Sequence, residues 1–529
     1  MTHGHAAPAE TQAVAPTTSP TTSPTTSPTA TLDKHLVVAS LMAPTAAAVA
    51  AELRQLTEEV DVAEIRLDGV WKEVPTEDAA TEDLLTILDA ATVPLLATLR
   101  PTRQGGRFHG PEPVRLGLLS AAAQAGFKVL DVELDSVVPG LVAELRKTGA
   151  QLVVSHHMGE TPCRSDGLDP LQAMQDAGAH IDKLAFEAGS FPDALRALEL
   201  TRGHALRGGH PSVSTMGYGG GPLRALLALA GNQATYGHSP GLEPAAPGQP
   251  DLSEVLRIWR HWGLRPADLH GPPRPWLAVL GNPAMHSLSP RLHNAALRAA
   301  GRTERFGSLD VPGSPGALRL LFHAAPRLGM VGASITHPHK ADAARIADCD
   351  PVAKAVGAAN CVRFGPEGAA ATNTDATALQ RLLRPHVRAG AVAGVLGAGG
   401  AARAAAWALH GLGAQVHVVG RDATRAQAAA GPGHAVAWEA RARLRPSVWV
   451  QATTLGLHGE PSPLADVDLE GALVVELNYA QGATALQRQA AQAGCAVIEG
   501  RMVLLEQALD AYRFWFGSEP DRGAMEAQA

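Results

Sequence analysis

The first half of the chain alternates short apolar runs with alanine- and leucine-rich stretches of helical spacing, such as 47–56 and 113–126. Buried parallel strands read as continuous apolar runs, and the crossovers between them are helices. Eight such β/α units in about 230 residues predict a TIM (β/α)8 barrel. The alternative is an open doubly wound sheet, which usually has fewer strands. The eight runs are 36–42, 62–67, 94–99, 128–134, 151–156, 182–187, 211–216 and 234–237.

A second α/β series follows a proline- and glycine-rich stretch at 270–275, whose composition is typical of a linker. The series opens with an apolar strand and turn at 276–282. A new strand–loop–helix unit spans 391–413, and a second strand follows it at 416–421. We therefore expect a barrel, then a small α/β substrate domain, then a dinucleotide domain.

The composition of the 529-residue chain argues against several classes of protein. A net charge of −7 gives no reason to expect a nucleic-acid partner or an anionic membrane surface, and no apolar run has membrane-spanning length. The four cysteines, Cys163, Cys349, Cys361 and Cys495, lie far apart, which fits a reducing cytosol better than a disulfide framework or a zinc cluster. The TTSP repeats within 1–33 lack large apolar side chains and targeting features, so we expect a disordered tail there.

Charged side chains gather at the ends of the predicted barrel strands, where a TIM barrel has its active site. Lys183 lies in an otherwise apolar strand, where desolvation and nearby arginines would disfavour its ammonium form and make it a usable nucleophile. A Schiff base at Lys183 would acidify a neighbouring C–H. His157 would take that proton and then protonate a leaving hydroxyl. Arginines suit a carboxylated polyol. The other charged residues at these strand ends are Glu64, Arg66, Arg100 and Arg224.

These residues also have structural explanations. A single lysine at a strand end often extends its ammonium group toward solvent and has no catalytic role. The His156–His157 pair fits a polar cap or two metal ligands, although no third ligand lies at a supporting spacing. The residues by themselves leave these alternatives open.

The segment VLGAGGAARA at 395–404 follows a predicted strand and opens a helix. Glycines there let the backbone approach a pyrophosphate, whose charge then meets the helix N-terminus. The pattern is GxGGAxxA rather than GxGxxG, and alone it equally fits a helix-capping turn. Arg421 and Arg425 follow the second strand and suit the 2′-phosphate of NADP, whereas Asp422 argues for NAD.

Polar motifs precede this loop and offer serine hydroxyls, an amide, an amine and a carboxylate. Such groups recognise a polyhydroxylated ring. The serines of HSLSP also fit a turn that caps a helix, and His337 and His339 fit metal ligands or solvent-facing side chains. The motifs are GNPAMHSLSPRLHN (281–294), GASITHPHK (332–340), VGAANCV (356–362) and ATNTDATAL (371–379).

The motifs of the first half are AEIRLDGV (63–70), ATLRPTRQGGRF (97–108), VVSHHMGETP (153–162), DKLAFEA (182–188), STMGYGGGPLR (214–224) and AAPGQ (245–249). In order and spacing, over about 36–260, they resemble the signatures of type I 3-dehydroquinate dehydratases. The resemblance implies that Lys183 is the Schiff-base lysine and that His157 is the general acid and base. The implied substrate contacts are Glu64, Arg66, Arg100, Arg224, Gln249 and, more weakly, Ser40.

Two positions depart from this family. Gln104 lies where a glutamate is usual near the histidine, so any role of that carboxylate in sharing a proton is missing. Ala245 replaces the serine that usually precedes APGQ, which removes one hydroxyl contact. We expect a functional first site and leave open a lower rate.

The polar motifs of the second half, together with VVELNYAQGATAL (474–486) and EGRMVLLEQALDAYRFW (499–515), resemble shikimate dehydrogenases over 276–516. The resemblance implies that Lys340 and Asp375 move the alcohol proton as hydride passes to or from NADP. The implied ring contacts are Ser287, Ser289, Thr336, Asn360, Tyr479 and Gln507. The implied cofactor contacts are Gly397, Ala398, Gly399, Gly400, Ala401, Arg421, Arg425 and Gly500.

This half departs from its family only in the cofactor-binding part. QATTLG (451–456) replaces a loop that usually begins with asparagine, and Gly420 replaces a common asparagine before the arginine. NADP affinity is therefore less firmly implied than the chemistry.

Together the two resemblances imply a bifunctional enzyme that dehydrates 3-dehydroquinate and then reduces 3-dehydroshikimate with NADPH. Two alternatives stay open: a barrel that serves only as a scaffold, and a quinate/shikimate dehydrogenase that prefers NAD. No metal is expected, and the sequence sets no oligomeric state. The expected parts are a tail (1–33), the barrel (34–268), the substrate domain (276–390), the Rossmann domain (391–498) and a helix that packs back on the substrate domain (499–517).

Overall fold

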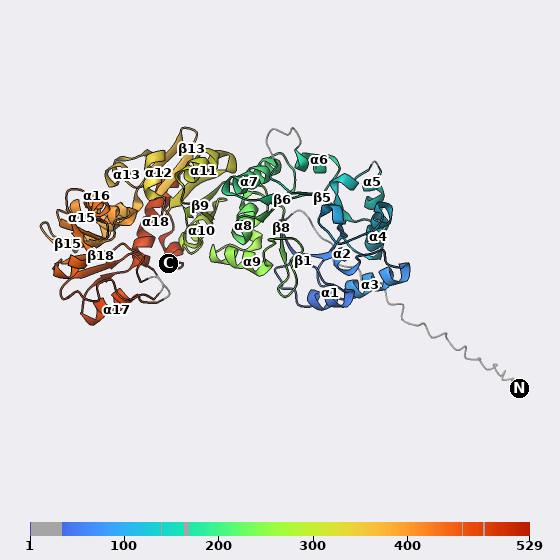
Figure 1. Ribbon diagram of the computed structural model, residues 1–529, viewed down its shortest axis with the longest axis horizontal. Helices are drawn as coiled ribbons and strands as arrows, with labels where there is room; N and C mark the ends of the chain where they lie inside the picture. The colour runs from blue at the N-terminus through green and yellow to red at the C-terminus, as the bar shows by residue number, and fades with distance from the viewer. Residues whose placement is uncertain (2–33, 139, 163–168, 457–458, 480–481) are drawn as a thin grey trace.

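The computed structural model describes residues 1, 34–138, 140–162, 169–456, 459–479 and 482–529. The predicted tail, apart from its first residue, and the predicted free thiol of Cys163 lie outside the described residues. Figure 1 shows the remaining chain as three successive α/β units, with the C-terminal helices returning to the middle one.

Eight parallel strands form the first sheet, in the order β7-β6-β5-β4-β3-β2-β1-β8. This nearly closed barrel confirms the predicted fold and excludes the open doubly wound alternative. Apolar side chains from alternate positions, mostly valines and leucines, fill its interior. The strands are β1 (Leu36–Leu41), β2 (Val62–Arg66), β3 (Leu95–Thr98), β4 (Val129–Glu133), β5 (Gln151–Met158), β6 (Ile181–Ala188), β7 (Pro211–Gly217) and β8 (Ala234–His238).

The seam between β7 and β8 is joined partly by side chains. Val213 N donates to Asn232 Oδ1, Asn232 Nδ2 donates to Val213 O, and Ser212 Oγ donates to Ala234 O. The amide thus pairs with the strand backbone where no regular strand ladder forms. The helices around the barrel are α1 (Ala46–Leu53), α2 (Leu67–Val70), α3 (Glu77–Asp89), α4 (Glu112–Ala125), α5 (Leu141–Arg146), α6 (Pro170–Asp176), α7 (Phe191–Leu206), α8 (Gly220–Ala230) and α9 (Leu252–His261).

The second sheet is mixed, in the order β10-β9-β11-β13-β14-β12, and β13 is antiparallel to both of its neighbours. Its strands are β9 (Trp276–Gly281), β10 (Arg305–Asp310), β11 (Met330–Ile335), β12 (Asp348–Cys349), β13 (Cys361–Gly365) and β14 (Gly368–Thr372). Its helices are α10 (Ser289–Ala299), α11 (Pro315–Leu328), α12 (Lys340–Ile346), α13 (Pro351–Val356) and α14 (Thr374–Leu383).

The third sheet is wholly parallel, in the doubly wound order β17-β16-β15-β18-β19-β20. Its strands are β15 (Val392–Leu396), β16 (Gln415–Gly420), β17 (His434–Ala437), β18 (Val448–Gln451), β19 (Leu473–Glu476) and β20 (Val497–Ile498). Its helices are α15 (Gly400–His410), α16 (Ala423–Ala430) and α17 (Ala485–Gln492). Helix α18 (Gly500–Phe516) then returns to the second sheet, where Trp515 Nε1 donates to Val362 O at 2.9 Å. The chain ends with α19 (Arg522–Glu526).

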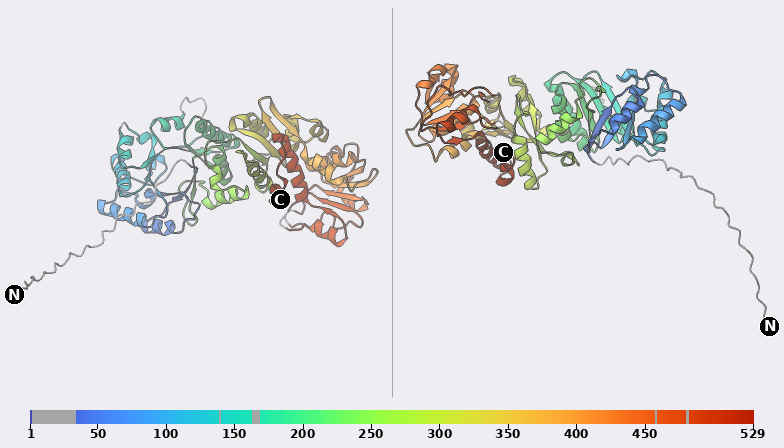
Figure 2. Two further views of the ribbon diagram at one scale, coloured as in Figure 1. Left: turned by 180° about the vertical axis from the view of Figure 1, so that it is seen from behind. Right: turned by 90° about the horizontal axis from the view of Figure 1, so that it is seen from below.

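The barrel packs directly on the second unit, and Figure 2 shows the three sheets in a row with the mixed sheet in the middle. Helix α7 lies against α11, and α8 lies against β10. One apolar cluster extends from the barrel helices into the second sheet. Across the described parts of the chain, we find no helix with the length and apolar character needed to cross a bilayer.

Candidate active sites

Lys183 lies on β6 inside the barrel, with only 7% of its surface exposed. Its Nζ donates to Glu64 Oε1 and to Asp131 Oδ2, both at 2.9 Å, and lies 4.1 Å from the centre of the Tyr236 ring. The expected burial is present, and Arg100, which binds the same Asp131 oxygen, is a nearby arginine as expected. The direct pairing of the ammonium group with two carboxylates was not expected. The burial also excludes the solvent-facing alternative.

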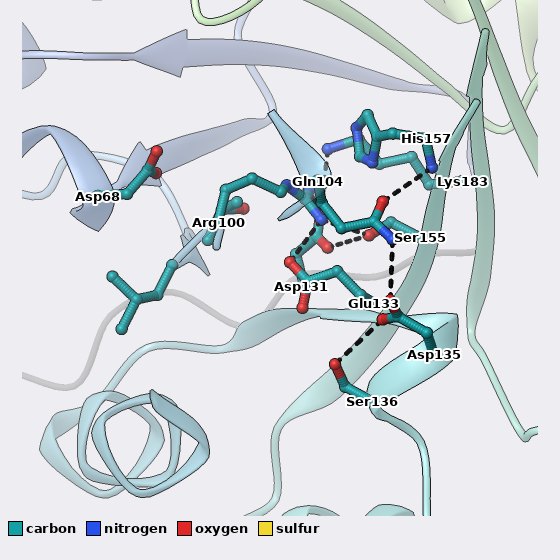
Figure 3. A network of polar contacts seen from close by, with 12 residues as sticks. Asp68, Arg100, Gln104, Asp131, Glu133, Asp135, Ser136, Ser155, His157 and Lys183 are labelled. Atoms are coloured by element: carbon teal, nitrogen blue, oxygen red, sulfur yellow. Dashed lines mark hydrogen bonds and ion pairs between the residues drawn. The ribbon is translucent and has the colours of Figure 1, made fainter. Parts of the chain in front are cut away.

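A buried ionic network surrounds this amine (Figure 3). Arg100 donates to Asp131 at 2.8 Å, to Glu133 at 2.7 Å and to Ser155 at 2.7 Å. Although burial opposes it, the charges of Arg100 and Lys183 hold the pKa of Asp131 well below its usual range. Sequence reasoning missed Asp131 and Glu133. The sequence feature that could have identified them is a pair of acidic residues at alternate positions of a strand that is otherwise apolar.

His157 lies at the end of β5, next in the barrel to the strand that carries Lys183. Its backbone N–H donates to Gln104 Oε1 at 3.3 Å, and Gln104 Nε2 donates to Asp135 Oδ2 at 3.1 Å. Its ring Nδ1 is buried without a hydrogen-bond partner in the described structure. Burial, followed by the charges of Arg100 and Lys183, lowers the pKa of His157 well below 6.5, so the ring is neutral at neutral pH.

The remaining residues predicted for the first site lie around this network. Ser40 Oγ donates to Glu64 Oε2 at 2.5 Å, and Gln249 Nε2 donates to Ser40 Oγ at 3.0 Å. Arg66 pairs with Asp68 and also donates to the Ala245 carbonyl at 2.7 Å. The backbone at 245 therefore holds Arg66 even though the usual serine is missing.

Among the three arginines predicted to contact the substrate of the first site, Arg224 is the one for which the described structure shows no carboxylate partner. Its guanidinium donates to Ser214 Oγ and to the carbonyls of Thr215 and Tyr236. Burial lowers the pKa of Arg224 to about 10. A buried cation that contacts only neutral groups favours binding of an anion.

The second site centres on an ion pair between Lys340, the first residue of α12, and Asp375 in the first turn of α14. Lys340 Nζ lies 2.5 Å from Asp375 Oδ2, and both side chains are mostly buried. The pair lines a cavity of about 190 Å³. All six predicted ring contacts line the same cavity: Ser287, Ser289, Thr336, Asn360, Tyr479 and Gln507.

Hydrogen bonds fix two sides of this cavity. Ser287 Oγ donates to Ser289 Oγ at 3.1 Å and interacts with the Tyr479 hydroxyl. The serines of HSLSP therefore face the cavity in addition to starting α10. On the other side Asn360 Nδ2 donates to Thr374 Oγ1 at 3.0 Å. Sequence reasoning did not include Thr374, although it lies next to Asp375.

A larger cleft of about 550 Å³ adjoins the cavity at the ends of β15, β16 and β18. Gly397 there has φ 108°, and a Cβ on it would lie 2.9 Å from Ala452 O, so the turn requires glycine. A Cβ at Gly400 would lie 2.9 Å from Lys340 Cβ. The glycine loop therefore lies against the first carbons of the Lys340 side chain, next to the Lys340–Asp375 ion pair. Of the predicted cofactor residues, Gly397, Ala398, Gly399, Arg421 and Arg425 line the cleft, whereas Ala401 and Gly500 line the smaller cavity.

Two residues that bear on cofactor binding, Asp422 and Gln451, have clear structural roles. Asp422, the argument for NAD, accepts from Arg425 N at 3.0 Å and caps α16. Gln451 accepts from Thr453 N and Oγ1 and donates to Leu455 O, so it shapes the 453–455 loop. Sequence reasoning did not include Trp438, which also lines the cleft.

Metal binding receives no support from the described residues, in which no group of three or more His, Cys, Asp or Glu is placed to hold an ion. His339 is buried and its Nε2 donates to Val311 O at 2.9 Å. His156 is half-buried on β5.

Comparison with known proteins supplies the family. The family model for type I 3-dehydroquinase matches residues 37–264, and the model for the shikimate dehydrogenase substrate binding domain matches 279–362. A shikimate dehydrogenase (NADP(+)) of Anaeromyxobacter sp. (strain Fw109-5) is 39% identical over 265 residues, which are 47% of this chain and 93% of that protein. The chain belongs to the shikimate dehydrogenase family, fused to a type I 3-dehydroquinase.

The fused 3-dehydroquinase/shikimate dehydrogenase also has a relative that spans both halves. The bifunctional 3-dehydroquinate dehydratase/shikimate dehydrogenase of Arabidopsis thaliana is 29% identical over 489 residues, covering 86% of this chain and 78% of the plant protein. A shikimate dehydrogenase of Thermus thermophilus, solved with NADP(H) and shikimate, is 34% identical with a TM-score of 0.42 over 48% of this chain and 97% of that one.

Proposed function

We propose that the fused chain catalyses two consecutive reactions, the dehydration of 3-dehydroquinate to 3-dehydroshikimate and its NADPH-dependent reduction to shikimate. The observation that carries the proposal is the presence of two different lysine sites in one chain. Lys183 lies beside His157 in the barrel, and the Lys340–Asp375 pair lines a ring-sized cavity, with Gly400 of the dinucleotide loop against Lys340.

The first reaction is assigned to the amine of Lys183, which attacks the ketone carbon and releases its oxygen as water. The resulting imine withdraws electrons and acidifies the adjacent C–H. His157 removes that proton in its neutral form and then gives it to the hydroxyl that leaves as the second water. Arg224, which has no carboxylate partner in the described structure, suits the carboxylate of the substrate. Hydrolysis of the imine releases the product and restores Lys183.

The second reaction is assigned to Lys340 and Asp375. NADPH, when bound, supplies the hydride. The ammonium of Lys340 donates a proton to the ketone oxygen, and Asp375 orients the ammonium through the 2.5 Å contact. Ser287, Ser289 and Tyr479 are proposed to hold the ring on one side of the cavity, with Thr336, Asn360 and Gln507 completing its lining.

The residues that line the larger cleft support the proposal that it binds NADP. Gly397 lets the backbone approach a pyrophosphate, and two arginines at the end of β16 and the start of α16 offer a charged site for a 2′-phosphate. Ala398, Gly399 and Gly400 are proposed to complete the loop, and Ala401 and Gly500, which line the smaller cavity, are proposed to contact the cofactor from that side.

Replacing both Arg421 and Arg425 by alanine should raise KM for NADP+ by about tenfold or more, because two guanidiniums that suit a 2′-phosphate are lost. KM for NAD+ should change little. Initial rates with shikimate and with quinate, each with NADP+ and NAD+, measure this effect and also decide the quinate and NAD alternatives. Arg445→Ala, an exposed arginine of the same unit, is the control. An equal rise of both KM values would contradict the assignment.

Replacing Gln104 by glutamate should move the acid limb of the dehydratase pH profile to higher pH. In the wild type, the lowered pKa of His157 keeps the ring neutral at pH 6.5, and activity falls only as the pH drops through that pKa. A carboxylate at 104, near the His157 backbone, favours the imidazolium and raises this pKa, by roughly half to one unit. The measurement is kcat/KM against pH. Gln104→Ala, which adds no charge, should leave the limb in place.

A coupled assay tests the proposal as a whole. The full chain is given 3-dehydroquinate and NADPH, and the loss of NADPH is followed by absorbance while shikimate is identified by chromatography. NADPH consumption from supplied 3-dehydroshikimate but not from 3-dehydroquinate would instead support a barrel that acts only as a scaffold.

We further propose a cytoplasmic location and keep the domain limits at 34–268, 276–390, 391–498 and 499–517. Free thiols at Cys349, Cys361 and Cys495 support the reducing compartment.

A further inference from the structure

The last helix of the barrel touches the substrate loop of the dehydrogenase, residues 282–288, which joins β9 to α10 and carries Ser287. His261, the final residue of α9, places its Nε2 3.0 Å from the carbonyl oxygen of Ser287. Because a carbonyl oxygen only accepts hydrogen bonds, Nε2 carries the hydrogen and donates it. Ser287 is the residue whose hydroxyl lines the shikimate-sized cavity. One bond therefore joins the two catalytic halves at a substrate contact.

Neighbouring contacts from the same turn support this loop. Trp262, which is fully buried, donates through Nε1 to Ser308 Oγ at 3.1 Å, and Ser308 Oγ lies 2.9 Å from Met285 Sδ. Asn294 Nδ2 on α10 donates to Trp262 O at 2.8 Å. The loop before α10 is thus held between the second sheet and the end of α9.

The position of Ser287 also affects Ser289 and Tyr479, two other residues in the wall of the cavity. Its Oγ accepts from Ser289 N at 3.2 Å, donates to Ser289 Oγ at 3.1 Å and interacts with Tyr479. A shift of the peptide at 287 would therefore move one wall of the cavity. Lys340 and Asp375 belong to α12 and α14 and are attached to other strands of the sheet, so such a shift leaves the proton-transfer pair in place.

We propose that His261 is a positioning residue for the dehydrogenase, through which the barrel holds Ser287 in the geometry that binds the ring of the substrate. The inference rests on the proposed function of the second site. His261 lies within 37–264, the segment matched by the dehydratase model, whereas Ser287 lies in the segment matched by the dehydrogenase model. In this chain, a residue of the dehydratase barrel therefore helps to position a substrate-binding residue of the dehydrogenase.

The test compares full-length His261→Ala, His261→Gln and Arg298→Ala in shikimate oxidation. In His261→Ala, KM for shikimate should rise about fivefold, the effect of losing one hydrogen bond, with kcat and KM for NADP+ unchanged. His261→Gln, which restores an N–H donor, should recover at least half of the loss. Shikimate affinity by calorimetry should follow KM. Dehydratase activity, measured in the same samples, should be unchanged.

Arg298→Ala is the matched control, because Arg298 Nη2 on α10 donates to Gly263 O at 2.8 Å and so joins the same two units away from the loop. An equal rise of KM in Arg298→Ala, or a KM within twofold of wild type in His261→Ala, would overturn the proposal. If the wild type neither oxidises nor binds shikimate, the proposed function of the second site fails instead.

Discussion

Replacing Lys183 by arginine is expected to abolish the dehydratase reaction, by about 10⁴-fold or more, while the same protein still reduces supplied 3-dehydroshikimate. Arginine keeps a positive charge between Glu64 and Asp131, so the buried carboxylates retain a cationic partner. Its guanidinium stays protonated and cannot form an imine. Loss of activity in this variant would therefore report loss of the nucleophile rather than collapse of the ionic network.

Lys183→Ala is expected to be equally inactive and also less stable, since it leaves two carboxylates buried side by side without the ammonium group. Thermal unfolding distinguishes the two variants. Borohydride trapping with 3-dehydroquinate, read by intact mass, should give one adduct in the wild type and none in either variant. Lys147→Ala, which removes an exposed lysine just after α5, should trap normally. An adduct that persists in Lys183→Arg would place the imine on another lysine.

Replacing Lys340 by alanine is expected to lower the dehydrogenase kcat by about 10³-fold, because the proton donor to the ketone is lost. Given 3-dehydroquinate and NADPH, this variant should accumulate 3-dehydroshikimate, whereas Lys183→Arg should consume neither substrate. Asp375→Asn, which leaves the ammonium without its carboxylate, should lower kcat by about 10²-fold.

The accumulated compound is measured by its ultraviolet absorbance and confirmed by chromatography. Lys354→Ala provides the control, because Lys354 is an exposed lysine of α13 in the same unit and lies outside the cavity. If Lys340→Ala kept more than a tenth of the wild-type kcat, the 2.5 Å pair with Asp375 would have a structural role and the proton would come from elsewhere.

Much of the fold was predictable because burial leaves a regular mark on a sequence. The apolar runs beginning near Leu36, Val62 and Leu95 fall on β1, β2 and β3, and the other five runs fall on the remaining barrel strands. A strand buried on both faces needs apolar side chains throughout, so its position can be read without tertiary information. The dinucleotide unit was predictable for a related reason, since its glycine turn follows directly after a buried strand.

The neighbours of the predicted residues were not predictable in the same way. The pairing of Lys183 with Asp131 joins residues 52 positions apart, and its contact with Glu64 joins residues 119 apart. Spacing along a chain gives the strand on which a side chain lies, but not which side chains from other strands it meets. The pairing of Lys183 with two carboxylates was not predicted for that reason.

The sequence by itself determined the order of the units, the positions of their strands and the residue types able to carry each reaction, because all of these depend on local pattern. Only the tertiary structure decided that Gln104 binds the backbone of His157, that Arg224 has no carboxylate partner among the described residues, and that His261 reaches Ser287. Barrel closure and the packing of α9 against the second unit bring those groups together. Contacts of this kind depend on the three-dimensional path of the whole chain and leave no periodic signal in its sequence.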